Sequence, residues 1–180
     1  RNLENRTVRV LILGIPNVGK STLINTLAGR VIAKTGNEPA VTKMLQRIQL
    51  PNSIQLLDTP GFLWPKLSPE ECGYRLATTG AIKDAVIELD EVAMFAAEFL
   101  LAAYPDALIS RYQLQQPLPA SAVELMDAIG ARRGCLRRGG TADLHKVAEI
   151  LLNDLRSGAL GRISLETPEM IAQMNNPEPE

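Results

Sequence analysis

The sequence predicts an α/β protein in which a small strand–helix–strand unit comes first and an all-helical part follows. The β-rich run TVRVLILG, Thr7–Gly14, is typical of a buried strand, and a helix is expected over Lys20–Ala28 with Gly29 in its stop position. Two further strand patterns, MLQRIQL and SIQLLD, flank a Pro-Asn turn as in a β-hairpin. After the proline-rich loop at residues 58–71 the β patterns end, so we expect the boundary between the two parts near residue 86.

The first helical patterns after this loop differ in strength. Pro69–Leu89 is only weakly helical, and we expect Gly73 and Gly80 to interrupt it. Asp90 can cap a stronger helix, whose apolar residues recur at helical spacing until Pro105 interrupts it.

Two more helices follow from their caps and their apolar spacing. Ser121 and Glu124 form an S-x-x-E capping box, which opens a helix that ends near Arg133. Thr141 is expected to cap the clearest helix of the chain. Its apolar stripe consists of Leu144, Val147, Ala148, Leu151, Leu152 and Leu155. The final QMNNPEPE is expected to be disordered.

Composition narrows the class of protein. Of the 180 residues, 46% are apolar, which is enough to form a core, and no apolar run approaches the roughly 20 residues of a membrane span. Cys72 and Cys135 lack CxxC spacing, so free thiols are expected. The first residue is Arg1 rather than Met, which suggests a piece of a longer protein. The net charge of −1 conceals two basic regions, residues 1–60 and 130–163, that suit polyanionic partners.

The most informative motif is GIPNVGKST, between the first expected strand and the first expected helix. Gly14-x-x-x-x-Gly19-Lys20-Ser21 fits the pattern of a phosphate-binding P-loop. In such a loop glycines let backbone N–H groups surround phosphate, and the helix N-terminus adds partial positive charge. Lys20 would reach the β- and γ-phosphates, and Ser21 would offer its hydroxyl to Mg²⁺.

Two other motifs are unspecific by themselves but become informative beside a P-loop. Asp58-Thr59-Pro60-Gly61 follows the last expected strand, where the carboxylate could hold Mg²⁺ through water and the Gly61 N–H could meet the γ-phosphate. Thr42, in PAVTK, could bind Mg²⁺ only when a γ-phosphate is present. Asp, Pro and Gly are also ordinary turn residues, and a single loop threonine is common, so neither motif is specific alone.

The P-loop, the Thr42 motif and DTPG resemble the G1, G2 and G3 motifs of translation-factor-type GTPases. Such a GTPase should also carry an N/TKxD motif, whose Asp recognises guanine. No NKxD or TKxD occurs after Gly61, and that region is helical in pattern. The sequence therefore contains a phosphate site without the usual base-recognition site downstream of it.

Four segments together resemble one family, the circularly permuted GTPases of the ribosome biogenesis GTPase A (YlqF) family. They are GIPNVGKSTLIN, PAVTK, LLDTPGFLWPK and RRGCLRRGGTADLHKVAEILLNDLRSGALGRIS. In that family the base-recognition motifs G4 and G5 precede G1, G2 and G3, and a helical domain follows. The resemblance implies a partial P-loop NTPase fold that lacks its G4/G5 strands, followed by an all-α C-terminal domain. The implied domains are a GTPase part at 1–86, a helical domain that is a candidate for rRNA binding at 87–170, and a disordered tail at 171–180.

The resemblance also implies roles for single residues. Lys20 is the expected catalytic residue. The residues expected to line the nucleotide are Gly14, Asn17, Val18, Gly19, Lys20, Ser21, Thr22 and Gly61. Mg²⁺ would be held by Ser21, Thr42 and, through water, Asp58. Asn17 is similar to the P-loop asparagine that binds K⁺ in potassium-stimulated GTPases, and the alternative is that it is only a turn residue. Ala40 replaces the glycine expected before Val-Thr.

In the expected mechanism the attacking water is positioned by a potassium ion, by a histidine in the missing N-terminal part or by the ribosome. Phe62 stands where Ras-like GTPases carry a glutamine that orients the attacking water, and phenylalanine cannot do so. His145 is expected to be an exposed helix residue without a catalytic role. Trp64 could be either a contact of the switch loop or a local anchor.

The expected partner is the large ribosomal subunit and its precursor, both rRNA and ribosomal proteins, in the cytoplasm or, for an organellar relative, the mitochondrial matrix. The candidate RNA-binding residues are Arg132, Arg133, Arg137 and Arg138. Neighbouring glycines make their segment an expected mobile connector. Neither DNA nor an integral membrane segment is expected.

Two other functions are open. The chain by itself could be an RNA-binding module with a residual phosphate site and no guanine specificity. It could also be a P-loop ATPase or kinase whose arginines close on ATP, although the DTPG loop and the downstream match argue against that.

Overall fold

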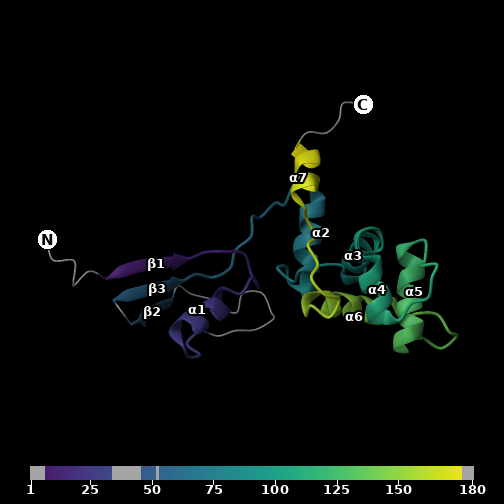
Figure 1. The fold of residues 1–180 in the computed structure, drawn as a ribbon, viewed down its shortest axis with the longest axis horizontal. Helices are drawn as coiled ribbons and strands as arrows, with labels where there is room; N and C mark the ends of the chain where they lie inside the picture. Colours follow the sequence, from purple (N-terminus) through teal and green to yellow (C-terminus); the bar gives the residue numbers. More distant parts are fainter. Residues whose placement is uncertain (1–6, 34–45, 52, 176–180) are drawn as a thin grey trace. The chain divides into compact units, whose positions relative to one another are not determined.

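The computed structural model describes residues 7–33, 46–51 and 53–175 of the chain. The chain divides into two compact units, residues 1–87 and residues 88–180, and each is described by itself. The first unit carries the strands and the second is helical (Figure 1).

The first unit contains a three-stranded sheet in the order β1-β3-β2. Strand β1, Val8–Ile12, runs parallel to β3, Ile54–Asp58, with Ile12 opposite Asp58 at the end of the pair. Strand β2, Gln46–Leu50, pairs with β3 in antiparallel register and forms the expected hairpin. Helix α1, Lys20–Ala28, begins and ends as predicted, because Gly29 closes it in the left-handed region.

The small core of this unit lies between α1 and the sheet. Ile24 of α1 packs with Ile48 of β2 and Leu56 of β3, and all three are buried. The prediction that the first strand is buried is wrong. Val8 and Leu11 of β1 are 55% and 51% exposed. The reason is that β1 is an edge strand of this sheet, with β3 alone beside it among the described strands.

The helices after the sheet are α2 at Glu70–Thr78, α3 at Leu89–Ala103, α4 at Pro105–Tyr112, α5 at Ala122–Arg133, α6 at Leu144–Arg156 and α7 at Pro168–Asn175, with a 3₁₀ turn at Asp84–Val86. Helix α2 runs through Gly73, which does not interrupt it, and ends before Gly80, whose φ of 78° is left-handed. The expected tail also differs, because residues 171–175 belong to α7 and are helical.

Helices α3, α5 and α6 pack against one another and form the core of the helical unit. From the predicted stripe of α6, Val147, Leu151 and Leu152 are buried, whereas Leu144 at its start is exposed. Helix α5 approaches its neighbours closely at Gly130. A Cβ atom there would lie 2.7 Å from the Cβ of Ala142, so only glycine fits.

The predicted helix starts are partly correct. Ser121 caps α5, since its Oγ accepts from the Glu124 N–H at 3.3 Å. Helix α3 starts two residues earlier than predicted, with Glu88 rather than Asp90 at its N-cap. Helix α6 starts after Asp143, not after Thr141. The Thr141 carbonyl accepts from the Arg137 N–H at 2.8 Å, so Thr141 belongs to the preceding turn.

Candidate functional site

The predicted P-loop connects β1 to α1, and its backbone alternates in handedness. Asn17 has a φ of 59° and Gly19, at the N-cap of α1, a φ of 88°, both in the left-handed region. Successive residues of alternating handedness direct their N–H groups into a concave anion-binding nest. This loop at a helix N-terminus therefore has the backbone form of a phosphate cradle.

Lys20, the first residue of α1, folds back over this loop. Its Nζ donates to the Ile15 carbonyl at 2.7 Å. Partial burial lowers the pKa of Lys20, and the negative charge of Asp58 partly offsets that effect. A phosphate bound in the loop would add further negative charge, so the ammonium ion is placed where an anionic ligand stabilises it.

The DTPG segment lies directly against the P-loop. Thr59 Oγ1 donates to the carbonyl of Ile12 at 2.8 Å, which ties the segment to the end of β1. A Cβ atom on Gly61 would lie 2.7 Å from both the N and the Cα of Pro16, so a larger residue would displace the loop. The structure thus brings Asp58 and Gly61 close to the P-loop and Lys20, about 40 residues before them in the sequence.

The PAVTK motif lies outside the described residues, since Ala40 and Thr42 fall within 34–45. The proposed Mg²⁺ ligands that are described are Ser21, in the first turn of α1, and Asp58, which is fully buried at the end of β3. Their hydroxyl and carboxylate oxygens suit a hard cation. Within the described ranges no cluster of three or more His, Cys, Asp or Glu could hold a metal.

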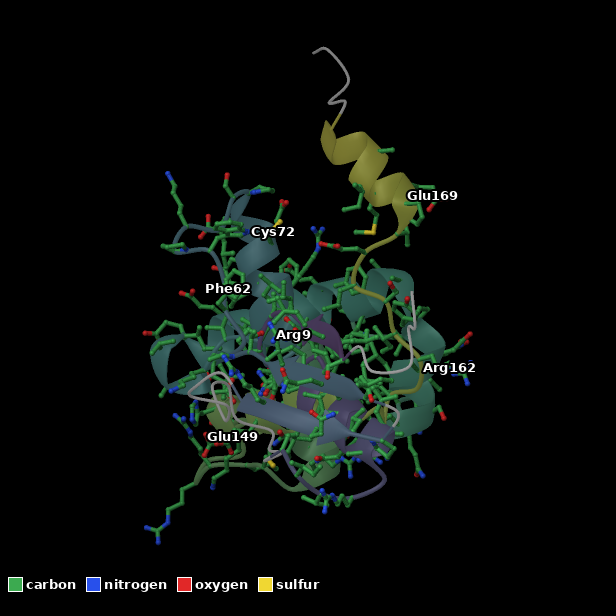
Figure 2. The ribbon with its side chains drawn as sticks, turned by 90° about the vertical axis from the view of Figure 1, so that its left-hand side faces the viewer. Arg9, Phe62, Cys72, Glu149, Arg162 and Glu169 are labelled. Carbon is green, nitrogen blue, oxygen red and sulfur yellow. The ribbon has the colours of Figure 1, made fainter. Side chains whose placement is uncertain are left out.

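Aromatic residues project from the loop after Gly61. Phe62, labelled in Figure 2, is 57% exposed and Trp64 is 74% exposed. Their rings meet edge to face with centroids 6.3 Å apart. Among the described residues Trp64 is thus an exposed ring that contacts Phe62.

The arginine-rich segment is more ordered than predicted. Instead of a mobile connector, it forms a hydrogen-bonded turn in which Leu136 pairs with Ala142 and the Asp143 N–H donates to the Cys135 carbonyl at 2.8 Å. The glycines at its tip, Gly139 and Gly140, adopt left-handed φ values, which a tight turn requires.

The four candidate RNA-binding arginines fall into two pairs. Arg137 binds Asp143 at 3.1 Å, and Arg133 binds Asp154 at 3.4 Å and lies over the Tyr112 ring. Within the described part of the chain no ion pair involves Arg132 or Arg138, and both are exposed. The second pair is therefore the more available to an external phosphate.

Asp154 is the centre of a charged cluster that the sequence did not reveal. Arg111 donates to both of its carboxylate oxygens, at 2.6 and 2.9 Å. Burial alone would raise the pKa of Asp154, but the Arg111 hydrogen bonds and the charges of Arg111 and Arg133 outweigh it and lower the pKa. Asp154 lies within a stripe of apolar residues on α6, so a signal existed: a buried acid requires a partner.

His145 and the two cysteines lie outside the predicted phosphate-binding motifs. His145 lies 3.1 Å from Asp90 and 3.9 Å from Glu149, and its side chain is exposed as expected. Cys72 and Cys135 are free thiols. None of the described helices is by itself long and apolar enough to cross a membrane, and α3 with α4 meets that test only as a pair bent by 110°.

Comparisons with known proteins agree with this geometry. Residues 9–108 match the model of a family described as 50S ribosome-binding GTPase. The chain is 51% identical over 168 residues to ribosome biogenesis GTPase A of Priestia megaterium, covering 93% of this chain and 58% of that protein. It is 31% identical over 167 residues to the Thermotoga maritima protein of that name, covering 93% of this chain and 59% of that protein. The chain thus spans less than two thirds of these relatives.

Solved structures lead to the same group. The GDP-bound structure of TM YlqF aligns with a TM-score of 0.66 at 28% identity, covering 93% of this chain and 64% of that one. The GNP-bound YlqF of T. maritima aligns with a TM-score of 0.60 at 28% identity, covering 92% and 61%. The chain therefore belongs to the 50S ribosome-binding GTPase family, as its resemblance to ribosome biogenesis GTPase A predicted.

Proposed function

We propose that this chain is the phosphate-binding and ribosome-facing portion of a GTPase that acts as a switch in late assembly of the large ribosomal subunit. The observation that carries the proposal is the contact of Gly61 with Pro16, because it joins the DTPG segment to the P-loop. That contact links the loop that would bind phosphate to the loop that would sense the γ-phosphate. The names and nucleotide-bound structures of the relatives support the choice of GTP.

In the proposed mechanism this chain positions the phosphates and stabilises their charge. The P-loop N–H groups and Lys20 hold the β- and γ-phosphates, and the Gly61 N–H meets the γ-phosphate. Ser21, Thr42 and Asp58 would hold Mg²⁺, which neutralises charge that develops during phosphoryl transfer. Phe62 has no group that can orient water. We propose that a K⁺ ion, which Asn17 would hold, compensates in part for the missing glutamine.

The proposed switch follows from the same contacts. GTP would order the loops of Thr42 and Gly61, and this form would bind the ribosomal precursor until hydrolysis releases the γ-phosphate. The exposed ring of Trp64 lies three residues after Gly61 and would move with that loop.

The proposed partner of the helical unit is rRNA of the large subunit, together with ribosomal proteins, in the cytoplasm. Arg132 and Arg138 are the primary phosphate contacts, since Arg133 and Arg137 already bind carboxylates of the same unit. Few aromatic residues accompany these arginines, which favours recognition of the RNA backbone and shape over base stacking.

The test uses the full-length protein and the Lys20→Ala variant. Loss of the ammonium group removes the charge that meets the phosphates, so GTP binding and turnover should be abolished. Lys83→Ala, which removes an exposed lysine of the same unit, is the matched control and should bind GTP normally. Normal turnover by Lys20→Ala would refute the assignment.

A second candidate function applies to residues 1–180 by themselves. The observation that favours it is the exposed strand β1, which pairs with β3 alone among the described strands. The chain spans less than two thirds of its relatives, and it contains no N/TKxD motif after Gly61. We infer that residues 1–180 alone bind RNA and keep a weak phosphate site without guanine specificity. Calorimetry with GTP and ATP should give weak and similar affinities. Tight binding of GTP alone would contradict this second function.

A further inference from the structure

The P-loop forms a hydrogen bond with a residue that lies outside the nucleotide-binding motifs. The side-chain Nδ2 of Asn17 donates to the carbonyl oxygen of Gly80 at 2.8 Å, across 63 positions of the sequence. Since only the nitrogen end of an amide can donate to a carbonyl, the chemistry fixes which end of Asn17 faces Gly80. Both residues lie in the first unit of the chain.

The Asn17 end of this bond is a sensitive point of the loop. Pro16 just before it has a fixed φ, and Ile15 is restricted because it precedes a proline. The path of the loop therefore depends on the left-handed conformations of Asn17 and Gly19. Asparagine tolerates this conformation better than most residues, and a side-chain hydrogen bond stabilises it further.

The Gly80 end is equally well fixed. The Ala81 N–H donates to the Leu76 carbonyl and the Gly80 N–H to the Ala77 carbonyl, each at 2.9 Å. This pair of bonds is the Schellman motif that closes a helix, with Gly80 at its left-handed position. Gly80 and Ala81 are both buried. The Gly80 carbonyl is thus an acceptor held in place by the end of α2.

We propose that Gly80 is a positioning residue of the nucleotide site, and that its carbonyl holds Asn17 so that the end of α2 stabilises the binding conformation of the P-loop. The inference rests on the proposed function, because it concerns the loop that would bind the phosphates of GTP. Coupling between two sites is reciprocal, so nucleotide binding stabilises the end of α2 in return.

The test compares four variants of the full-length protein. Asn17→Gly keeps the left-handed backbone but removes the amide, and Asn17→Asp keeps the shape but cannot donate. Gly80→Ala strains the closure of α2 and displaces its carbonyl. Gly73→Ala is the matched control on the same helix, where a Cβ has an ordinary contact with Leu67 at 3.8 Å.

Two measurements read out the coupling: the affinity for a fluorescent GDP, and hydrogen exchange of the Gly80 and Ala81 N–H groups. Each of the three disruptive variants should weaken GDP binding about fivefold, as expected for one hydrogen bond, and Gly73→Ala should not. Asn17→Gly combined with Gly80→Ala should cost no more than either change alone. Saturating GDP should slow exchange at Gly80 and Ala81 in the unmodified protein but not in the Asn17 variants.

Several results would overturn the inference. Full GDP affinity in Asn17→Asp would show that the donated hydrogen bond has no effect. Multiplicative losses in the double variant would show that the two residues act independently. The losses of GDP affinity in the Asn17 variants should persist when Na⁺ replaces K⁺. If these losses disappeared in Na⁺, Asn17 would act only as a cation ligand. Absence of GDP binding in the unmodified protein would instead refute the proposed function, and this inference with it.

Discussion

The two units of the chain differ in how completely they bury their apolar side chains. In the first unit Val8 and Leu11 of β1 are largely exposed, and so are Leu23 and Leu27 of α1. In the helical unit α3, α5 and α6 enclose a core in which residues such as Leu151 have no exposed surface. The P-loop geometry therefore depends on local backbone conformation and a few contacts, whereas the helical unit depends on packing.

One leucine-to-alanine substitution in each unit should have very different effects on stability. Leu151→Ala opens a cavity in a packed core and should lower the free energy of unfolding of the helical unit by about 2–5 kcal/mol. Leu11→Ala removes a half-exposed side chain and should cost the first unit less than about 1 kcal/mol.

Urea unfolding measures both effects. Hydrogen exchange of the backbone N–H groups of α6 and of β3, measured at increasing urea concentration, follows the two units separately. Equal losses in the two variants would show that β1 is packed as tightly as α6.

The next effect concerns the charged cluster of the helical unit. Asp154→Asn leaves Arg111 and Arg133 without their carboxylate and should cost about 1–3 kcal/mol, because Asp154 is largely buried while Arg111 is partly solvated. Asp143→Asn, beside the exposed Arg137, is the control and should have a much smaller effect. Urea unfolding at neutral pH measures both.

The pH dependence of this cluster has a definite sign. The pKa of Asp154 is lowered in the folded state, so its contribution is fully present above the ordinary aspartate pKa of about 3.9. That contribution is lost as the pH falls through the lower folded pKa. The unmodified chain should therefore lose more stability below about pH 4 than Asp154→Asn does. Parallel pH profiles for the two proteins would contradict this.

A smaller effect is expected where the two loops of the phosphate site touch. Gly61→Ala places a methyl group against the Pro16 backbone, which cannot move without shifting the P-loop. We expect the full-length protein to lose at least about tenfold in GTP affinity, which corresponds to about 1.4 kcal/mol. Titration with a fluorescent GTP analogue measures it, and an unchanged affinity would show that the two loops are independent.

The smallest effect concerns single phosphate contacts of the helical unit. Arg138→Ala should weaken binding to a large-subunit rRNA fragment and reduce the slope of log affinity against log salt by about one. Arg137→Ala should change that slope less, because Arg137 already binds Asp143. The reverse order would mean that the Asp143 pair opens on RNA binding.

Local signals in the amino-acid sequence determine much of this protein. The bounds of α1 follow from Lys20 and Gly29, the start of α5 follows from Ser121, and the P-loop and DTPG motifs follow from residue type and spacing. These features depend on hydrogen bonds and backbone preferences within a few residues, so the sequence is sufficient to predict them.

The tertiary structure alone decided which distant residues meet. It left β1 at the edge of its sheet, set Gly61 against Pro16, joined Asn17 to Gly80 and used Arg133 to neutralise Asp154. None of these pairings has a local signature, because burial and ion pairing depend on the packing of segments that are far apart along the chain. The sequence by itself therefore determined the chemistry of the phosphate loop, and the fold decided what holds that loop and which arginines are available to RNA.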